Sequence, residues 1–240
     1  MRFSFHRGRT VTQCPKLLVG FSPRLPDRSC PAENKPGTTC AASLTCRFIR
    51  THCYFFMIKL EPFTSDDFTQ LMEWVDDERL MKEWSGSMFS FPLTEAGLSW
   101  YIEGSNDVNA PNVFIYKAVD SKTGTTVGHI SLGGISERDR AGRITRVLVG
   151  NSTERRRGIC QGMVKALLRI GFEELKLHRI SLGVYDFNHA AINCYLKCGF
   201  QKEGRMRDVV RHGDGYWTLV EMGILEDEWR ALYPKPHGSE

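Results

Sequence analysis

The chain has 240 residues, of which 41% are hydrophobic and 25% are charged, and its formal net charge is +4. These proportions are close to those of soluble globular domains, so they exclude wholesale disorder and a fibrous repeat. The longest unbroken apolar run is far shorter than the roughly 18 residues that a membrane-spanning helix needs, so we expect no membrane span and no membrane partner.

Charge and cysteine content divide the chain near Met57. Residues 1–56 hold nine Lys and Arg against two Asp and Glu, whereas the other 184 residues hold 23 and 26. The first segment also holds five of the eight cysteines, an odd number that argues against a closed disulfide framework. It shows no helical or strand period, so we expect a disordered N-terminal extension at 1–56 and a single domain at 57–240. A targeting segment and a partner-binding tail stay open as alternatives.

The first part of the domain predicts a short strand, two helices and a hairpin. Ile58 and Leu60 indicate the strand, and the capping residues Thr64–Asp67 precede a helix. A second helix follows Thr94. The hairpin and the next strand are predicted at residues 112–119, 126–132 and 143–149.

The second part alternates helices with strands. The polar residues 151–158 end the preceding strand, and an amphipathic helix starts at Ile159. Further elements are predicted as a strand at 179–184, a helix at 188–197, a strand start at 200–203 and a last strand at 216–225. Strands dominate the beginning and the end of the domain, and a βαβ unit lies in the middle. We therefore expect the fold class α/β, with a mixed sheet of the α+β kind.

Three arginines stand where the helix at Ile159 begins. Arg155, Arg156 and Arg157 face the positive end of the helix dipole, so they repel it unless an anion is present. Gly158 lets the backbone approach a ligand closely, and successive N–H groups can then wrap a phosphate. A solvated basic loop or a nucleic-acid patch is the alternative interpretation of this segment alone.

A second motif lies between Asn188 and Phe200. Together with the arginine loop it closely resembles the GNAT N-acetyltransferase superfamily, in particular its RimJ/RimL-like branch. The family's loop pattern is matched by Arg155, Gly158 and, imperfectly, Cys160. The later pattern is matched at Asn188, Ala191, Tyr195, Lys197, Gly199 and Phe200. The resemblance covers about residues 57–230, and it implies a mostly antiparallel central sheet of about seven strands with a splayed central strand pair and flanking helices.

The resemblance also implies roles for individual residues. The backbone of Val147, Leu148 and Val149 would pair with the pantetheine arm of acetyl-CoA and hold the thioester carbonyl. The loop of Arg155, Arg156, Arg157, Gly158, Ile159 and Cys160 would hold the pyrophosphate. Asn188 would fix the end of its strand and contact the pantetheine, and Tyr195 would protonate the departing thiolate. Gly199 would end the helix and Phe200 would enter the core. Acetyl-CoA is the implied co-substrate, and no metal is implied.

The general base is not evident from the sequence. Many relatives carry a glutamate on the strand before the loop, but residues 143–149 contain none. Candidates in or next to predicted strands are His129, Glu137, Asp186 and Glu221, each with a structural or surface role as the favoured alternative. For Arg143 and Arg146, solvent exposure or ion pairing is favoured over contact with an acidic substrate.

Cysteine and tryptophan residues offer weaker candidates. Cys160 at a helix N-terminus beside cations is expected to have a lowered pKa, although coenzyme A would cover it and a nucleophilic role is disfavoured. Cys194 and Cys198 are expected in the core. Trp74, Trp84 and Trp100 fall where this family builds its acceptor wall, and we expect two of the three to pack in the core.

The predicted function is acetyl-CoA-dependent N-acetyl transfer, by direct attack, to a primary amine of a small molecule or a protein N-terminus. The expected partner is this amine acceptor, and a homodimer is also possible. The expected location is the cytoplasm. Two alternatives remain: a catalytically idle GNAT-like module that binds coenzyme A, and a nucleic-acid-binding protein that uses the basic first segment. Nucleic acid is not the favoured partner, because the domain itself carries a slight negative charge.

Overall fold

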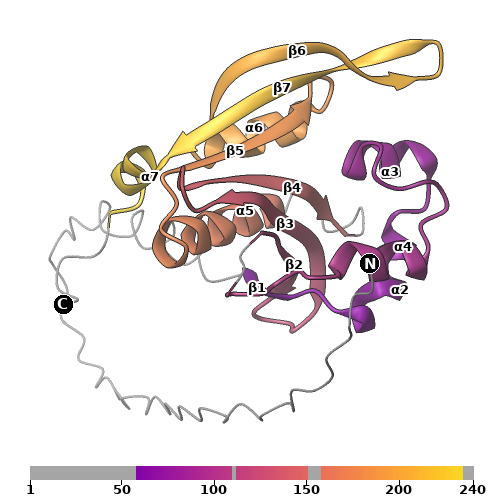
Figure 1. The fold of residues 1–240 in the computed structure, drawn as a ribbon, viewed down its shortest axis with the longest axis horizontal. Coiled ribbons are helices and arrows are strands. Elements are labelled where there is room, and N and C mark those ends of the chain that lie inside the picture. Colours follow the sequence, from indigo (N-terminus) through magenta and orange to yellow (C-terminus); the bar gives the residue numbers. More distant parts are fainter. Residues whose placement is uncertain (1–57, 110–111, 151–157, 235–240) are drawn as a thin grey trace, which may run out of the picture. The chain divides into compact units, whose positions relative to one another are not determined.

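A seven-stranded sheet forms the centre of the computed structural model, which describes residues 58–109, 112–150 and 158–234. The strands are β1 (Ile58–Pro62), β2 (Phe114–Asp120), β3 (Thr126–Ser136), β4 (Ala141–Val149), β5 (Arg179–Tyr185), β6 (Gln201–His212) and β7 (Gly215–Leu225). Their order is β1-β2-β3-β4-β5-β7-β6, and among these strands only β4 and β5 pair in parallel. The predicted fold class, mixed and mostly antiparallel, is therefore confirmed (Figure 1).

Six α-helices accompany the sheet in the described residues. They are α2 (Phe68–Trp74), α3 (Glu78–Ser85), α4 (Glu95–Ile102), α5 (Ile159–Arg169), α6 (His189–Lys197) and α7 (Glu226–Leu232), with a 3-10 turn η2 (Ser65–Asp67) and a π-helical turn η4 (Ile170–Glu174). At the predicted cap, Thr64 N donates a hydrogen bond to Asp67 Oδ2 at 2.9 Å. Two further helices are also capped: the Thr94 side chain accepts a hydrogen bond from Gly97 N at 3.2 Å, and the Asn188 side chain accepts one from Ala191 N at 3.0 Å. The sequence prediction omitted α3 and α7, which have eight and seven residues.

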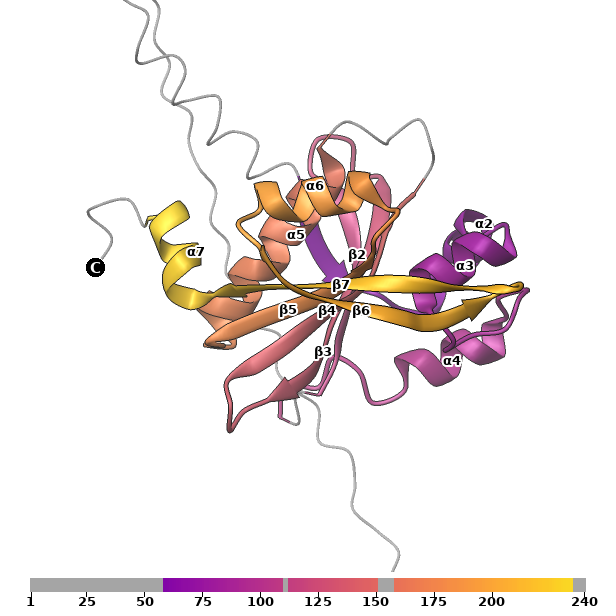
Figure 2. The same ribbon diagram turned by 90° about the horizontal axis from the view of Figure 1, so that it is seen from above.

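Two buried clusters hold the helices to the sheet. One contains α5, α6 and the sheet residues that face them, with Met163, Leu167 and Phe172 fully buried. The other contains α2, α3 and α4, with Leu98 and Ile115 fully buried. Figure 2 shows the same division, with α5 and α6 together over the sheet and α2, α3 and α4 as a separate group. Gly199 ends α6 and Phe200 is 2% exposed, as the motif predicted.

A β-bulge lies in the second half of β4. His129 pairs with Leu148, but Ser131 pairs with Thr145, so β4 holds one residue more than β3 in this interval. Arg146 has a φ of 52°, which is the left-handed conformation at which bulges often form. The extra residue changes which side chains of β4 point to which face of the sheet. Before the bulge the even-numbered Ile144 packs in the α5 cluster. After it the odd-numbered Val147 and Val149 do so, and Leu148 packs in the α2–α4 cluster.

Beyond the bulge, β4 and β5 separate. Their parallel pairing runs from Ala141 with Arg179 to Ile144 with Leu182 and stops there, although β4 continues to Val149 and β5 to Tyr185. The two strands diverge visibly in Figure 1. The backbone groups on the β5 side of residues 145–149 therefore have no strand partner, which is the splayed central pair that the resemblance implied.

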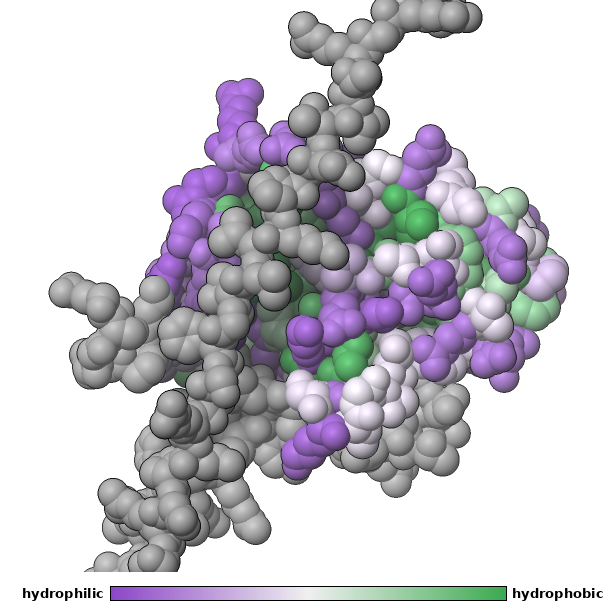
Figure 3. Space-filling model, turned by 90° about the horizontal axis from the view of Figure 1, so that it is seen from below, coloured by the Kyte–Doolittle hydropathy of each residue, from purple (hydrophilic) through white to green (hydrophobic). Residues whose placement is uncertain are grey.

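Several expectations fall outside the described residues. The extension at 1–56 and the arginines Arg155, Arg156 and Arg157 belong to these parts of the chain. Among the described residues, no helix is long and apolar enough to cross a membrane. On the face shown in Figure 3, the coloured residues include small hydrophobic groups set between hydrophilic ones.

Candidate functional site

A cleft of about 920 Å³ opens where β4 and β5 separate. Its walls come from α3, the whole second half of β4, the start of α5, the end of β5 and α6. The cleft therefore brings together the bulged strand, the first turn of α5 and the motif at 188–200, three segments far apart in the sequence.

The bulge in β4 is held by two side chains from other elements. The carbonyl oxygen of Arg146 accepts a hydrogen bond from Trp84 Nε1 at 3.0 Å and lies 3.1 Å from His129 Nδ1. Because a carbonyl can only accept, Nδ1 carries the proton of the His129 ring. His129 is 1% exposed, and its burial lowers its pKa to about 4. The ring is therefore neutral, and it supports the bulge. Because His129 is buried and does not line the cleft, it is not placed to take a proton from a substrate there.

Gly158 begins α5 at the edge of the cleft. It has a φ of 78° and a ψ of 10°, the left-handed conformation that glycine adopts without steric cost. Apart from its neighbours in the chain, none of the described residues has an atom within 4 Å of an added Cβ. Ile159 and Cys160 follow in the first turn of α5 and also line the cleft.

Asn188 and Tyr195 meet the cleft from α6. Asn188 caps the helix, so its side chain fixes the junction between β5 and α6. Tyr195 is 6% exposed and packs edge to face against Phe200, with ring centroids 6.1 Å apart. Burial, and then the neighbouring cysteines, raise the pKa of Tyr195 well above its usual value. The phenol therefore keeps its proton, which is the state that a proton donor requires.

Cysteines form an unexpected cluster at the same place. The Sγ atoms of Cys160 and Cys194 lie 2.9 Å apart, and Cys198 is fully buried next to them. The hydrogen bond with Cys194, and then burial, raise the pKa of Cys160 well above its usual value. The expectation that Cys160 has a lowered pKa is therefore wrong, because its closest polar partner is another thiol. Cys198 takes the core position that was expected, whereas Cys194 is only partly buried and lines the cleft.

Helix α3 forms the wall opposite the end of β5, and it contributes charged residues that the sequence prediction missed. Glu83 and Arg79 form an ion pair at 2.9 Å, and the Arg79 guanidinium lies 5.6 Å from the centroid of the Phe187 ring. Glu83 also helps to raise the pKa of Tyr185, after burial. The Asp77 cap and the apolar residues on one face of α3 are the local signals from which this helix could have been found.

The three tryptophans divide as expected. Trp84 is 6% exposed and Trp74 packs against the α2–α4 cluster, whereas Trp100 is 60% exposed. Trp84 is the one that also lines the cleft. Two of the three therefore pack in the core, and only one of these two contacts the candidate site.

An ion pair crosses the sheet at the point where the strands part. Both terminal nitrogens of Arg143 donate to the two carboxylate oxygens of Glu221, at 2.9 and 2.7 Å. The guanidinium passes over Gly183, where an added Cβ would lie 2.6 Å from the Arg143 Nη2 atom. Glu221 is thus already engaged by an arginine. Arg146 points differently, with its guanidinium 4.9 Å from the centroid of the Tyr101 ring.

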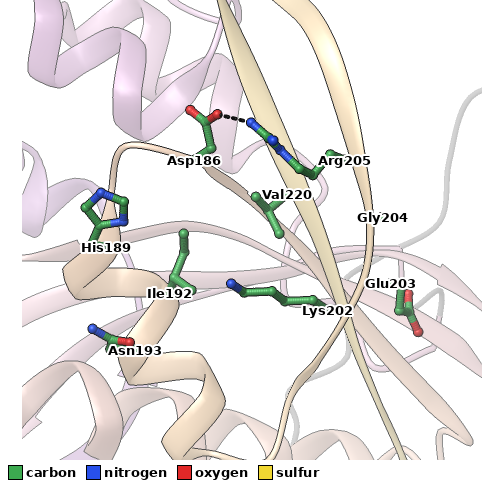
Figure 4. A pocket seen from close by; sticks show the side chains of 9 residues that line it. All are labelled: Asp186, His189, Ile192, Asn193, Lys202, Glu203, Gly204, Arg205 and Val220. Atoms are coloured by element: carbon green, nitrogen blue, oxygen red, sulfur yellow. Dashed lines mark hydrogen bonds and ion pairs between the residues drawn. The ribbon is translucent and has the colours of Figure 1, made fainter.

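A second hollow, of about 750 Å³, lies between α6 and the β6–β7 hairpin. Figure 4 shows His189, Ile192 and Asn193 of α6 facing Lys202 and Val220 across it. Asp186, a candidate base, lies here and forms an ion pair with Arg205 at 2.7 Å. Neither it nor Glu137, in the β3–β4 turn, lines the main cleft. Among the described residues, no group of three metal-ligating side chains is placed to hold a metal ion.

Comparison with known proteins agrees with this geometry. The family model of the acetyltransferase (GNAT) domain matches residues 58–201. A solved spermidine N-acetyltransferase of Vibrio cholerae, in complex with CoA and spermine, superposes with a TM-score of 0.62 at 19% identity, covering 72% of this chain and 98% of that one.

Two curated relatives match smaller parts of this chain. The SPbeta prophage-derived uncharacterized N-acetyltransferase YokL of Bacillus subtilis is 31% identical over 75 residues, which is 31% of this chain and 42% of the relative. An aminoglycoside N(6')-acetyltransferase type 1 of Klebsiella pneumoniae is 22% identical over 152 residues, or 61% of this chain and 75% of that protein. The chain thus spans less than half of the first relative's length.

Proposed function

The chain belongs to the acetyltransferase (GNAT) family, and from this premise we propose that it transfers the acetyl group of acetyl-CoA to a primary amine of a small molecule or a protein N-terminus. Within the family we place it in the RimJ/RimL-like branch, on the motif from Asn188 to Phe200. We place the reaction in the cytoplasm, by direct attack of the amine and without a covalent enzyme intermediate.

The observation that carries the proposal is the parting of β4 from β5 within a cleft that also reaches Gly158 and Tyr195. The backbone groups of Val147, Leu148 and Val149 on the β5 side of the strand would bind an extended arm as a strand binds its neighbour. The first turn of α5, opened by Gly158, presents N–H groups that favour a pyrophosphate. The residues present therefore fit acetyl-CoA, which supplies the activated acetyl group when bound.

Tyr195 is the group of the chain that we assign to proton transfer. Its raised pKa keeps the phenol protonated, so it can donate to the sulfur of the leaving thiol. We assign no general base: Glu221 is paired with Arg143, His129 is buried and Asp186 lies in the second hollow. An amine can also lose its proton through water, so the proposed reaction requires no dedicated base.

The acceptor would enter between α3 and the end of β5. Glu83 lines the cleft and is paired with Arg79, and Arg143, which also lines the cleft, holds the carboxylate of Glu221. The structural relative named above binds spermine, a polycation. We propose that the acceptor here presents one amine rather than a chain of several, because a polyamine would have to displace Arg79 or Arg143 to reach a free carboxylate.

A thiol-release assay over a panel of amines tests the proposal. The panel holds spermidine, an aminoglycoside, single-amine compounds and peptides with free N-termini, and mass spectrometry identifies the acetylated product. Turnover of a single-amine compound or a peptide supports the proposed acceptor class, whereas turnover of spermidine alone overturns it. Binding of acetyl-CoA by calorimetry with no turnover of any amine would favour the idle coenzyme A-binding module.

A further inference from the structure

We propose that Cys160 and Cys194 form a redox-sensitive pair in the cofactor cleft. A small-molecule disulfide such as glutathione disulfide converts the two thiols into an intramolecular disulfide, and this modification weakens acetyl-CoA binding. The effect on acetyl-CoA rests on the proposed function, whereas the formation of the disulfide does not.

The geometry of the two thiols carries the proposal. Their Sγ atoms are 2.9 Å apart, and a disulfide needs about 2.05 Å, so the atoms must approach by roughly 0.9 Å. Cys160 lies in the first turn of α5 and Cys194 one residue before Tyr195 on α6, and these two helices pack against each other. Side-chain rotation and a small helix shift are enough to close this gap.

Both thiols can also be reached by a reagent. Cys160 and Cys194 are partly exposed and line the cleft, whereas Cys198 is fully buried and lies 3.9 Å from the carbonyl oxygen of Gln161. The position of Cys194 also favours its ionised form. Hydrogen bonds with Cys160 and then with Cys198 lower the pKa of Cys194, and the cations Lys197 and Lys165 add to this. Thiolates are the attacking species in disulfide exchange, so Cys194 is the first to react.

The reaction balances in two exchange steps. The Cys194 thiolate attacks one sulfur of glutathione disulfide, forms a mixed disulfide and releases one glutathione thiolate. Cys160 then loses its proton to that thiolate and attacks the Cys194 sulfur, which releases the second glutathione. Two protein thiols are oxidised, and one glutathione disulfide is reduced to two glutathione molecules.

Disulfide formation would disturb the part of the cleft where the cofactor phosphates are expected. Drawing Cys160 toward α6 shifts the first turn of α5, whose N–H groups follow Gly158. We expect a displacement of this size in a binding turn to weaken acetyl-CoA affinity by about tenfold. The same movement pulls on the residue next to Tyr195, so binding and proton transfer are affected together.

Peptide mapping of the full-length protein tests the disulfide directly. After treatment with glutathione disulfide and alkylation of free thiols, tryptic digestion separates Cys160 (peptide 158–165), Cys194 (180–197) and Cys198 (198–202). We expect peptides 158–165 and 180–197 to appear as one species, lighter by two hydrogen atoms than their sum. A linkage of 180–197 to 198–202, or no linkage of 158–165, overturns the proposal.

Matched variants and calorimetry test the consequence. Treated wild-type protein should bind acetyl-CoA about tenfold more weakly than untreated protein, and dithiothreitol should restore the affinity. Treatment should leave the affinity of Cys194→Ser unchanged, which controls for the five cysteines of residues 1–56. Cys198→Ser should still form the linked peptide. A linked peptide with unchanged affinity overturns the switch, whereas failure of untreated protein to bind acetyl-CoA counts against the proposed function alone.

Discussion

Tyr195 packs in the core and also borders the cofactor cleft. It is 6% exposed, and its ring packs against Phe200. The aromatic ring therefore serves the packing of α6, and the hydroxyl is the group that we assign to proton transfer. A substitution that removes only the hydroxyl therefore separates the role in proton transfer from the role in packing.

For Tyr195→Phe we expect acetyl-CoA affinity to stay nearly unchanged and kcat to fall by about 10–10³-fold, because the ring packing remains and one proton donor is lost. Steady-state thiol release and calorimetry measure the two quantities. Since the pKa of Tyr195 is raised, its deprotonation should not lower the wild-type rate below about pH 10. A variant with wild-type kcat, or with its whole defect in acetyl-CoA affinity, would reduce Tyr195 to a packing residue.

His129 predicts an acid-sensitive component of stability. Its pKa in the folded protein is lowered to about 4 from an ordinary value of 6.5, so the unfolded chain takes up a proton on acidification before the folded one does. Stability is therefore full above pH 6.5 and is lost as the pH falls toward 4, by about 1.4 kcal/mol per unit.

Urea unfolding at pH 7.5 and at pH 5.0 measures this loss. Between these values the wild type should lose roughly 2 kcal/mol more than His129→Asn, which carries no titrating ring. Equal losses in the two proteins would show that His129 is not the group responsible. The variant should also be less stable at pH 7.5, because the bulge carbonyl of Arg146 loses one of its two partners.

At the scale of elements, the local patterns explain both the successes and the omissions of the sequence prediction. Capped helices such as α4 and α6 were found because their Thr94 and Asn188 caps precede apolar residues at helical spacing. For β6 the sequence predicted only a strand start at 200–203, and the strand runs to His212. Its end could not be predicted, because the strand is exposed along almost its whole length and shows no alternation of apolar and polar residues. The extent of β6 is set by its hydrogen bonding to β7, and such pairing cannot be seen in the residues of β6 alone.

The junction of β4 and α5 leads to a test with a matched control. Gly158 and Gly124 have φ values of 78° and 70°, and at both an added Cβ meets no atom within 4 Å. Gly158→Val and Gly124→Val should therefore each cost stability by about 1–2 kcal/mol. Only Gly158→Val should abolish acetyl-CoA binding, because its side chain projects where the pyrophosphate must approach.

Calorimetry of both variants decides the question. Unchanged affinity in Gly158→Val would rule out the phosphate cradle at the start of α5. A loss of affinity in Gly124→Val, which lies in the β2–β3 turn, would show that the effect arises from destabilisation rather than from the cleft.

At the scale of the whole molecule, we propose that residues 57–240 fold as one domain and that residues 1–56 are dispensable. The described residues from Ile58 onward supply all seven strands of the sheet and both buried clusters. A chain that begins at Met57 should therefore keep its Tm within about 3 °C of the full chain, the shift that corresponds to about 1 kcal/mol at this size.

Differential scanning calorimetry and acetyl-CoA titration compare the two chains. If the shorter chain loses most of its stability or its acetyl-CoA affinity, the first segment is part of the fold. Salt-dependent binding of nucleic acid by the full chain, lost in the shorter one, would support the alternative role of the basic segment.

The sequence by itself determined the order of most elements, the helix caps and the two motifs of the family, because these depend on residues close together in the chain. The three-dimensional arrangement decided the rest. His129 became a buried support of the bulge, Glu221 became the partner of Arg143, and Cys160 met Cys194, each through contacts across at least 17 residues. Such contacts arise only when strands and helices pack, so neither the state of these groups nor the walls of the cleft follow from local pattern.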